Sequence, residues 1–222
     1  MNSTSPAAAA WGDPDNRRAW KTLFTWAVLG QILWPLVCLG SLLLIVGPEW
    51  PVWLLFIPLV YSAYRSILQR RYLVDAFQVR RILKQYPWQV HKTPESGIGK
   101  VPGAKSGDVW LKFPNPEQSG DLIPVILHGH VRSPWWRRRL GPGVAPEKMA
   151  QVVEIWFAGD VRFAGVLAVP GPRRLFVVYQ RPTKDSRFLT DVREATPDAL
   201  ARARRAGVRV PERIDQWPFD VG

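Results

Sequence analysis

The feature that most constrains this chain is a stretch from residue 22 to residue 48 without a single charged side chain. A helix needs about 20 apolar residues to cross a bilayer, because each adds 1.5 Å along the axis and the hydrocarbon core is about 30 Å thick. At roughly −0.4 kcal/mol each, the fourteen strongly apolar side chains of this stretch contribute about −6 kcal/mol toward insertion. Gln31 and Pro35 oppose this without reversing it. The run is longer than the apolar part of a signal peptide and no small-residue cleavage site follows it, so we expect an uncleaved membrane helix.

A second uncharged stretch, residues 50–64, is shorter. It reaches spanning length only if the helix continues past Arg65 to about Leu68, with the guanidinium extended toward the headgroups. A re-entrant or interfacial helix is the alternative. Because only residues 47–51 separate the two stretches, they would pack as antiparallel neighbours. We therefore predict a transmembrane hairpin over residues 20–68, preceded by a disordered tail over residues 1–19.

The distribution of charge predicts the orientation of this hairpin. Basic residues flank the two spans, whereas the turn between them carries only Glu49. By the positive-inside rule both ends face the cytoplasm, and the predicted location is the plasma (inner) membrane of a bacterium. Small residues Gly30, Gly40 and Ser41 would let another helix approach, including one from a second copy of the chain. The flanking residues are Arg17, Arg18, Lys21, Arg65, Arg70 and Arg71.

The net charge of +12 lies entirely after residue 64. That part of the chain contains 27 of the 30 Lys and Arg and 15 of the 18 Asp and Glu. Such a basic domain would gain from contact with the anionic headgroups of the inner leaflet. Nucleic acid is a competing partner that we consider less favoured, and simple solubility is the plainest explanation. The single cysteine, Cys38, rules out an intramolecular disulfide and a cysteine metal cluster.

Beyond the spans, residues 69–86 show apolar side chains at helical spacing among arginines, and Pro87 ends the pattern. We expect a cytoplasmic connector helix whose apolar stripe packs on the soluble domain, with a position on the membrane surface as the alternative. Residues 87–107 contain Gly, Pro, Ser and Lys without periodicity and read as a linker.

The remaining residues, 108–222, form the predicted basic, β-rich soluble domain. Five short runs rich in β-branched or aromatic residues are bounded by Gly, Pro or Asp. They predict a small antiparallel barrel or sandwich, followed by a C-terminal helix that Thr196 caps and Pro197 begins. The fold class is thus an α+β membrane protein. The five strands are expected at residues 109–113, 123–127, 152–158, 162–169 and 175–180.

The most distinctive soluble segment contains Trp135, Trp136, Arg137, Arg138 and Arg139. Adjacent tryptophans and arginines combine an apolar wedge with charges that pair with headgroups, so these residues are candidates for membrane docking. Two alternatives stay open: one Trp fills the core while the arginines are solvated, or the segment stacks on nucleic acid.

Other motifs are weaker. His128 and His130 lack the third ligand that zinc requires. Residues 99–106 resemble a phosphate-binding loop, but Ala104 stands where Gly must precede Lys105. We therefore predict no catalytic, metal or cofactor site.

The hairpin and the Trp- and Arg-rich basic domain resemble the layout of small two-span membrane proteins in high-GC, actinobacteria-like genomes. This resemblance implies a membrane location and no particular chemistry. The function we expect is a non-enzymatic module that holds a basic domain at the cytoplasmic face to bind a protein partner or the lipid surface. The alternatives are an accessory subunit of a transport or secretion complex and an enzyme acting on a membrane-bound substrate.

Overall fold

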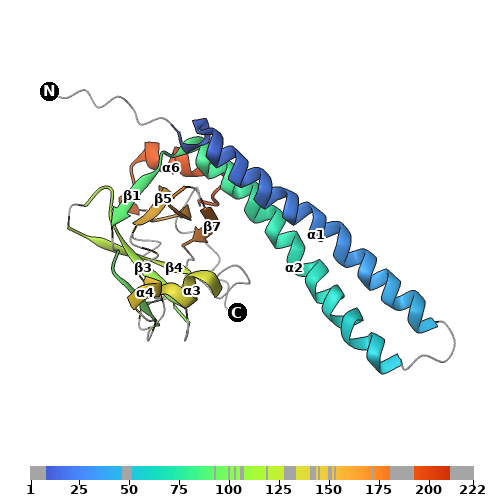
Figure 1. The fold of residues 1–222 in the computed structure, drawn as a ribbon. Coiled ribbons are helices and arrows are strands. Elements are labelled where there is room, and N and C mark those ends of the chain that lie inside the picture. Colours follow the sequence, from blue (N-terminus) through green and yellow to red (C-terminus); the bar gives the residue numbers. More distant parts are fainter. Residues whose placement is uncertain are drawn as a thin grey trace. The chain divides into compact units, whose positions relative to one another are not determined.

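The computed structural model describes most of the chain and divides it into two compact units (Figure 1). One consists of Met1–Arg17 and Val79–Gly222, the other of Arg18–Gln78. We call the first the β-rich unit and the second the helical pair. The described residues are 9–46, 52–92, 94–99, 101–102, 104–105, 108–118, 120–127, 134–140, 144, 146–149, 152, 154–171, 173–180 and 193–210.

Two long helices dominate the N-terminal part of the chain. Helix α1 runs over Pro14–Val46 and helix α2 over Val52–Gln85. Because α2 continues without a break through Pro58 and beyond residue 69, the predicted connector is part of the same helix as the second apolar stretch. Within the described residues, α1 is the one helix long and apolar enough to cross a membrane, and only 6% of its most apolar window is buried. The exposure of this apolar window is consistent with association with a membrane.

Contacts inside the helical pair fix the register of α1 against α2. Trp20 Nε1 donates a hydrogen bond to the carbonyl oxygen of Ala76 over 2.7 Å, and Gln69 Nε2 donates to that of Ala27 over 2.8 Å. Farther along, the rings of Trp34 and Tyr61 meet edge to face at 5.4 Å between centroids. The helices are therefore antiparallel: later residues of α1 contact earlier residues of α2.

The expectation of a disordered tail over residues 1–19 is wrong for residues 9–19, and residues 1–8 lie outside the described residues. A short 3-10 helix, η1 (Ala10–Gly12), precedes α1, and the amide of Ala10 donates to the carbonyl oxygen of Tyr86 over 3.0 Å. Asn16 is fully buried, donates to the carbonyl oxygen of Ala10 and accepts from Trp88 Nε1 at 3.2 Å. Tyr86 and Trp88 lie more than seventy residues from Ala10 and Asn16 in sequence, so local composition gave no sign of the order in residues 9–19.

Two antiparallel sheets form the β-rich unit, and they do not close into the predicted barrel. The first has the order β1-β5-β6-β7, and the second has the order β2-β3-β4. The last three predicted strands are confirmed as β5, β6 and β7, which pair antiparallel in sequence order as a meander. The bounds are Gln89–Lys92 (β1), Ser96–Ile98 (β2), Val109–Pro114 (β3), Leu122–Leu127 (β4), Glu154–Asp160 (β5), Ala164–Val169 (β6) and Arg173–Tyr179 (β7).

Strands β1 and β2 lie where the sequence predicted a linker. Each is an edge strand of three or four residues, paired on one side only. Neither strand has a buried position, so neither shows the alternation that marks a half-buried strand. Strand β1 is the edge strand of the first sheet, and β2 is the edge strand of the second. Each sheet is therefore open at this edge.

One apolar core joins the two sheets. It contains alternate residues of β3, such as Val109, Leu111 and Phe113, and faces Phe157 of β5 and Phe176 of β7. Helix α3 (Pro134–Leu140) adds Trp136 to this core, and the short helix α4 (Pro146–Met149) follows it.

The predicted C-terminal helix is confirmed as α6 (Pro197–Arg205), whose cap Thr196 accepts from the amide of Ala199. Its Ala203 packs with Phe163, Ala195 and Val210 in a second, smaller cluster.

Candidate functional site

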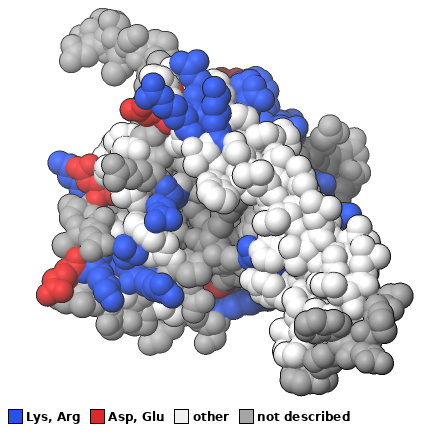
Figure 2. Space-filling model, turned by 45° about the vertical axis from the view of Figure 1, so that its right-hand side comes forward, with Lys and Arg blue, Asp and Glu red and all other residues white. Residues whose placement is uncertain are grey.

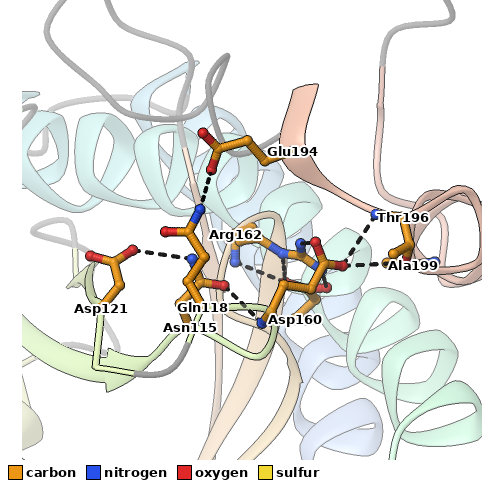
Figure 3. Close-up of polar contacts among 9 residues, drawn as sticks. Asn115, Gln118, Asp121, Asp160, Arg162, Glu194, Thr196 and Ala199 are labelled. Carbon is orange, nitrogen blue, oxygen red and sulfur yellow. Dashed lines mark hydrogen bonds and ion pairs between the residues drawn. The ribbon is translucent and has the colours of Figure 1, made fainter.

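Arg162 lies at the centre of the densest polar cluster that the structure describes (Figure 3). It occupies the turn between β5 and β6, where it is only 2% exposed. Its Nε and Nη2 donate to the two carboxylate oxygens of Asp160 at 2.9 and 2.7 Å, and its Nη1 meets Glu117 Oε2 at 2.8 Å. A buried guanidinium needs this kind of two-sided pairing, because an uncompensated charge inside a protein is costly.

Glu117 extends the cluster from the β3–β4 loop to the start of α6. Its Oε1 accepts from the backbone amide of Thr196 at 3.1 Å and from the Thr196 hydroxyl at 3.2 Å. Next to it, Gln118 Nε2 donates to Glu194 over 3.0 Å. The cluster therefore connects the β3–β4 loop, the β5–β6 turn and the N-terminus of α6.

The protonation states follow from these contacts. Burial alone would lower the pKa of Arg162, but the hydrogen bonds and charges of Asp160 and Glu117 outweigh it and raise that pKa above its usual range. Burial alone would raise the pKa of Glu117, but its hydrogen bonds with Arg162 and Thr196, together with the Arg162 charge, hold it below its ordinary value. At neutral pH both groups are charged, so the cluster stays an ion-pair network.

A cavity of about 350 Å³ opens beside this network. Amide, hydroxyl and carboxylate groups line it, which suits a small polar guest or water. The same groups bond to one another, so the clearest role of the cluster is to hold the three segments together. The lining residues are Asn115, Glu117, Gln118, Arg162, Glu194 and Thr196.

The predicted docking segment forms helix α3, and its two tryptophans have different roles. Trp136 is 1% exposed and belongs to the core, so its indole is not available to a membrane. Trp135 is half-buried, with the guanidinium of Arg139 4.1 Å and that of Arg174 5.8 Å from its ring centroid. Successive helical residues point about 100° apart, so Trp136 is buried in the core while Trp135 packs against it with only part of its indole.

The docking candidates that remain after this correction are the half-buried Trp135 and the arginines around it. Arg138 and Arg174 are exposed. Arg174 adopts a left-handed backbone conformation with φ 57° at the start of β7, which is uncommon for a residue other than glycine. The structure describes the backbone of Arg137 but not the surroundings of its side chain, and His128 and His130 lie outside the described residues.

The predicted topology flanks are at the ends of the apolar helical segments. Arg17, Arg18, Lys21, Arg70 and Arg71 are all exposed. Arg65 is half-buried, with its guanidinium 5.2 Å from the centre of the Trp34 ring. This cation–π contact gives Arg65 a partner within the helical pair.

Sequence reasoning did not find the Arg162 cluster. Its members come from three separate segments, and only the Asp160-x-Arg162 spacing is local. Comparison of the chain with protein-family models, with curated proteins and with solved structures gave no match. The case for function therefore rests on the physical chemistry of the chain itself.

Proposed function

We propose that this protein is a two-span membrane anchor that holds its basic β-rich unit at the cytoplasmic face of a bacterial inner membrane. The observation that carries the proposal is a matched pair of exposed apolar bands on α1 and α2. A water-soluble protein rarely leaves an apolar surface of this extent uncovered.

The two bands occupy the same stretch of the helical pair. The contacts of Ala27 with Gln69 and of Trp34 with Tyr61 bring Trp26–Leu44 of α1 alongside Leu54–Ile67 of α2. At 1.5 Å per residue the band on α1 is about 27 Å long, close to the thickness of a bilayer core. Its exposed members are Trp26, Leu29, Ile32, Leu33, Leu36, Val37, Leu39, Leu42, Leu43 and Leu44; those of α2 are Leu54, Phe56, Ile57, Val60, Tyr61, Tyr64 and Ile67.

Polar side chains of α2 along this stretch have partners inside the pair. Gln69 is buried against α1, and its amide occupies the space that a side chain at Gly30 would need. Ser62 and Ser66 hydrogen-bond to carbonyl oxygens one turn earlier in α2. These contacts lower the cost of placing α2 in lipid, because polar groups in a bilayer must be satisfied internally. They support a second span although α2 is less apolar than α1.

The orientation is testable by thiol labelling. In a Cys38→Ser chain, a cysteine at Glu49 lies between the two helices and a cysteine at Val90 lies in β1 on an exposed position. On intact cells a membrane-impermeant maleimide should label Glu49→Cys at once, and Val90→Cys only after permeabilisation. Labelling of Val90→Cys on intact cells, or of neither position until the cells are opened, would contradict the proposed topology.

We assign the presented unit a non-enzymatic binding role, with the α3 surface as its contact for lipid or a protein partner. Trp135, Arg138, Arg139 and Arg174 supply the aromatic and cationic groups that such surfaces use.

A role as an accessory subunit of a larger membrane complex is the second candidate. It is favoured by Gly40, beside which no atom lies within 4 Å of where a Cβ would stand. Glycine at such an open position lets a helix of another protein, or of a second copy, pack closely. Covalent crosslinking in native membranes, followed by purification in mild detergent, separates the candidates: a stoichiometric polytopic partner identifies a subunit, and its absence favours the autonomous anchor.

A further inference from the structure

Positive charge is concentrated at the end of the helical pair where the apolar bands stop. On α2, Arg70 and Arg71 follow directly after the last exposed apolar residue of the band, Ile67. On α1, Arg18 and Lys21 precede the band and are also exposed. In Figure 2 the helical pair presents a largely white surface.

Interhelical contacts bring the two basic groups to the same end of the pair. Trp20 of α1 bonds to Ala76 of α2, and the rings of Phe24 and Phe77 meet at 5.4 Å between centroids. Residues 18–24 of α1 therefore lie at the level of the first two turns of α2 beyond Arg71. The charges of both helices thus form one zone next to the apolar bands.

Apolar side chains stand exposed within the same zone. Val74 is 63% exposed and Phe77 is 47% exposed, at helical spacing from Arg70 and Arg71. Lys21, Arg70 and Arg71 form no ion pair within the described part of the chain. A surface on which basic side chains such as these three lie beside exposed apolar groups is typical of segments at the headgroup boundary.

We propose that this collar, formed by Lys21, Arg70, Arg71, Val74 and Phe77, binds the phosphate groups of anionic phospholipids. The inference rests on the proposed insertion of the hairpin, because insertion brings the collar to the level of the headgroups. Guanidinium groups pair with phosphate oxygens in a bidentate manner, and Phe77 and Val74 enter the boundary with the acyl chains. The collar is continuous with the apolar bands, so the phosphates within its reach belong to lipids.

The test measures which lipids contact the full-length protein in a bilayer. The purified chain is reconstituted into phosphatidylcholine vesicles that contain a trace of spin-labelled phosphatidylglycerol or spin-labelled phosphatidylcholine. The motionally restricted fraction of each label reports lipid in contact with protein. We expect the restricted fraction to favour phosphatidylglycerol, and the preference to weaken in 0.5 M NaCl because salt screens exposed charges.

The decisive variant is Arg70→Gln/Arg71→Gln. Its preference for phosphatidylglycerol should fall at least about five-fold at low salt, which is the contribution of one cation near an anionic leaflet. The matched control is Lys92→Gln/Arg205→Gln, which removes the same charge from exposed positions of the β-rich unit outside the α3 surface and should retain the preference. Circular dichroism confirms that each variant keeps its helices.

The possible outcomes distinguish a failure of the proposed lipid binding by the collar from a failure of the proposed membrane insertion. A restricted fraction that is equal for both lipids in the natural chain would overturn the inference while leaving insertion intact. A preference that survives Arg70→Gln/Arg71→Gln, or that is lost equally in the control, would also overturn it, since the collar would not be the binding surface. The absence of any restricted lipid would instead contradict insertion itself.

Discussion

Arg162 is the side chain that pairs with both Asp160 and Glu117 in the buried polar cluster of the β-rich unit. Replacing it with Met removes the cation that pairs with Asp160 and Glu117, and it leaves the buried Asp160 carboxylate without a compensating charge, although Glu117 keeps its bonds from Thr196. We expect Arg162→Met to lower the free energy of unfolding by about 3–5 kcal/mol, as for other broken buried pairs. Chemical denaturation of the full chain in detergent, followed by near-UV circular dichroism, measures the loss.

A surface pair provides the control for this prediction. Lys112 meets Glu95 at the same 2.8 Å, but both side chains are substantially exposed. Lys112→Met should cost about 1 kcal/mol or less. Equal losses in the two variants would contradict the importance that we assign to the buried network.

The low pKa of Glu117 predicts how the same network responds to pH. The carboxyl has a lower pKa in the folded than in the unfolded chain, so its charge stabilises the fold above the unfolded value of about 4.3. This stabilisation is lost as the pH falls through the lower, folded pKa. The natural chain and the Glu117→Gln variant should therefore differ in their free energy of unfolding at pH 7, and this difference should disappear under acid conditions. A stability difference that is independent of pH would show that the charge of Glu117 is not involved.

Two neighbouring tryptophans provide the sharpest contrast between adjacent residues. Trp136 is in the core, so Trp136→Ala should cost about 3–5 kcal/mol. Trp135 is half-buried beneath Arg139, and Trp135→Ala should cost about 1–2 kcal/mol. Thermal unfolding of both variants measures the contrast. A larger loss for Trp135→Ala would reverse the assignment of core and surface.

At the scale of elements, the approach of α1 to α2 depends on Gly30. The amide of Gln69 lies 2.5 Å from where a Cβ at Gly30 would stand, whereas Gly40 faces open space. Gly30→Leu should therefore push the helices apart, and Gly40→Leu should be tolerated within one copy of the chain. In a Cys38→Ser chain carrying Phe24→Cys and Phe77→Cys, a short thiol crosslinker should join the helices slowly in Gly30→Leu and at the normal rate in Gly40→Leu. Equal rates would exclude this contact as a determinant of helix packing.

The elements that sequence predicted well are those with local signals. The uncharged run of α1, the continuous periodicity of α2 and the Pro- and Gly-bounded meander β5-β6-β7 are all visible within short windows. Strands β1 and β2 were missed because only pairing with β5 and β3 defines them. The order of residues 9–19 depends on Tyr86 and Trp88, and the Arg162 cluster on three separated segments. Long-range partners of this kind leave no pattern in a local window of sequence.

The site was predicted less completely than the fold. The Trp- and Arg-rich segment was correctly singled out as unusual, but a linear pattern does not show which indole turns inward. That choice depends on where the start of α3 meets the core between the two sheets. The flanking arginines and Lys21 could be located from sequence alone, because charge next to an apolar run is a local property.

At the scale of the whole molecule, we propose that a membrane hairpin anchors a basic cytoplasmic unit. This proposal requires that α1 and α2 both lie in lipid. Leu39 is just beyond the Trp34–Tyr61 contact on α1, and Ile57 is just beyond it on α2, so the register places the two residues at one level. Both side chains are exposed on the helical pair.

Spin labels on Leu39→Cys and Ile57→Cys, each in a Cys38→Ser chain reconstituted in bilayers, test this claim most directly. If both helices span the bilayer, both labels will be far more accessible to oxygen than to a water-soluble nickel chelate, and both will report the same depth. A label at Val90→Cys, in contact with water, provides the reference for an exposed position. Nickel accessibility at Ile57→Cys as high as at Val90→Cys would contradict the two-span anchor and leave α1 as a single span.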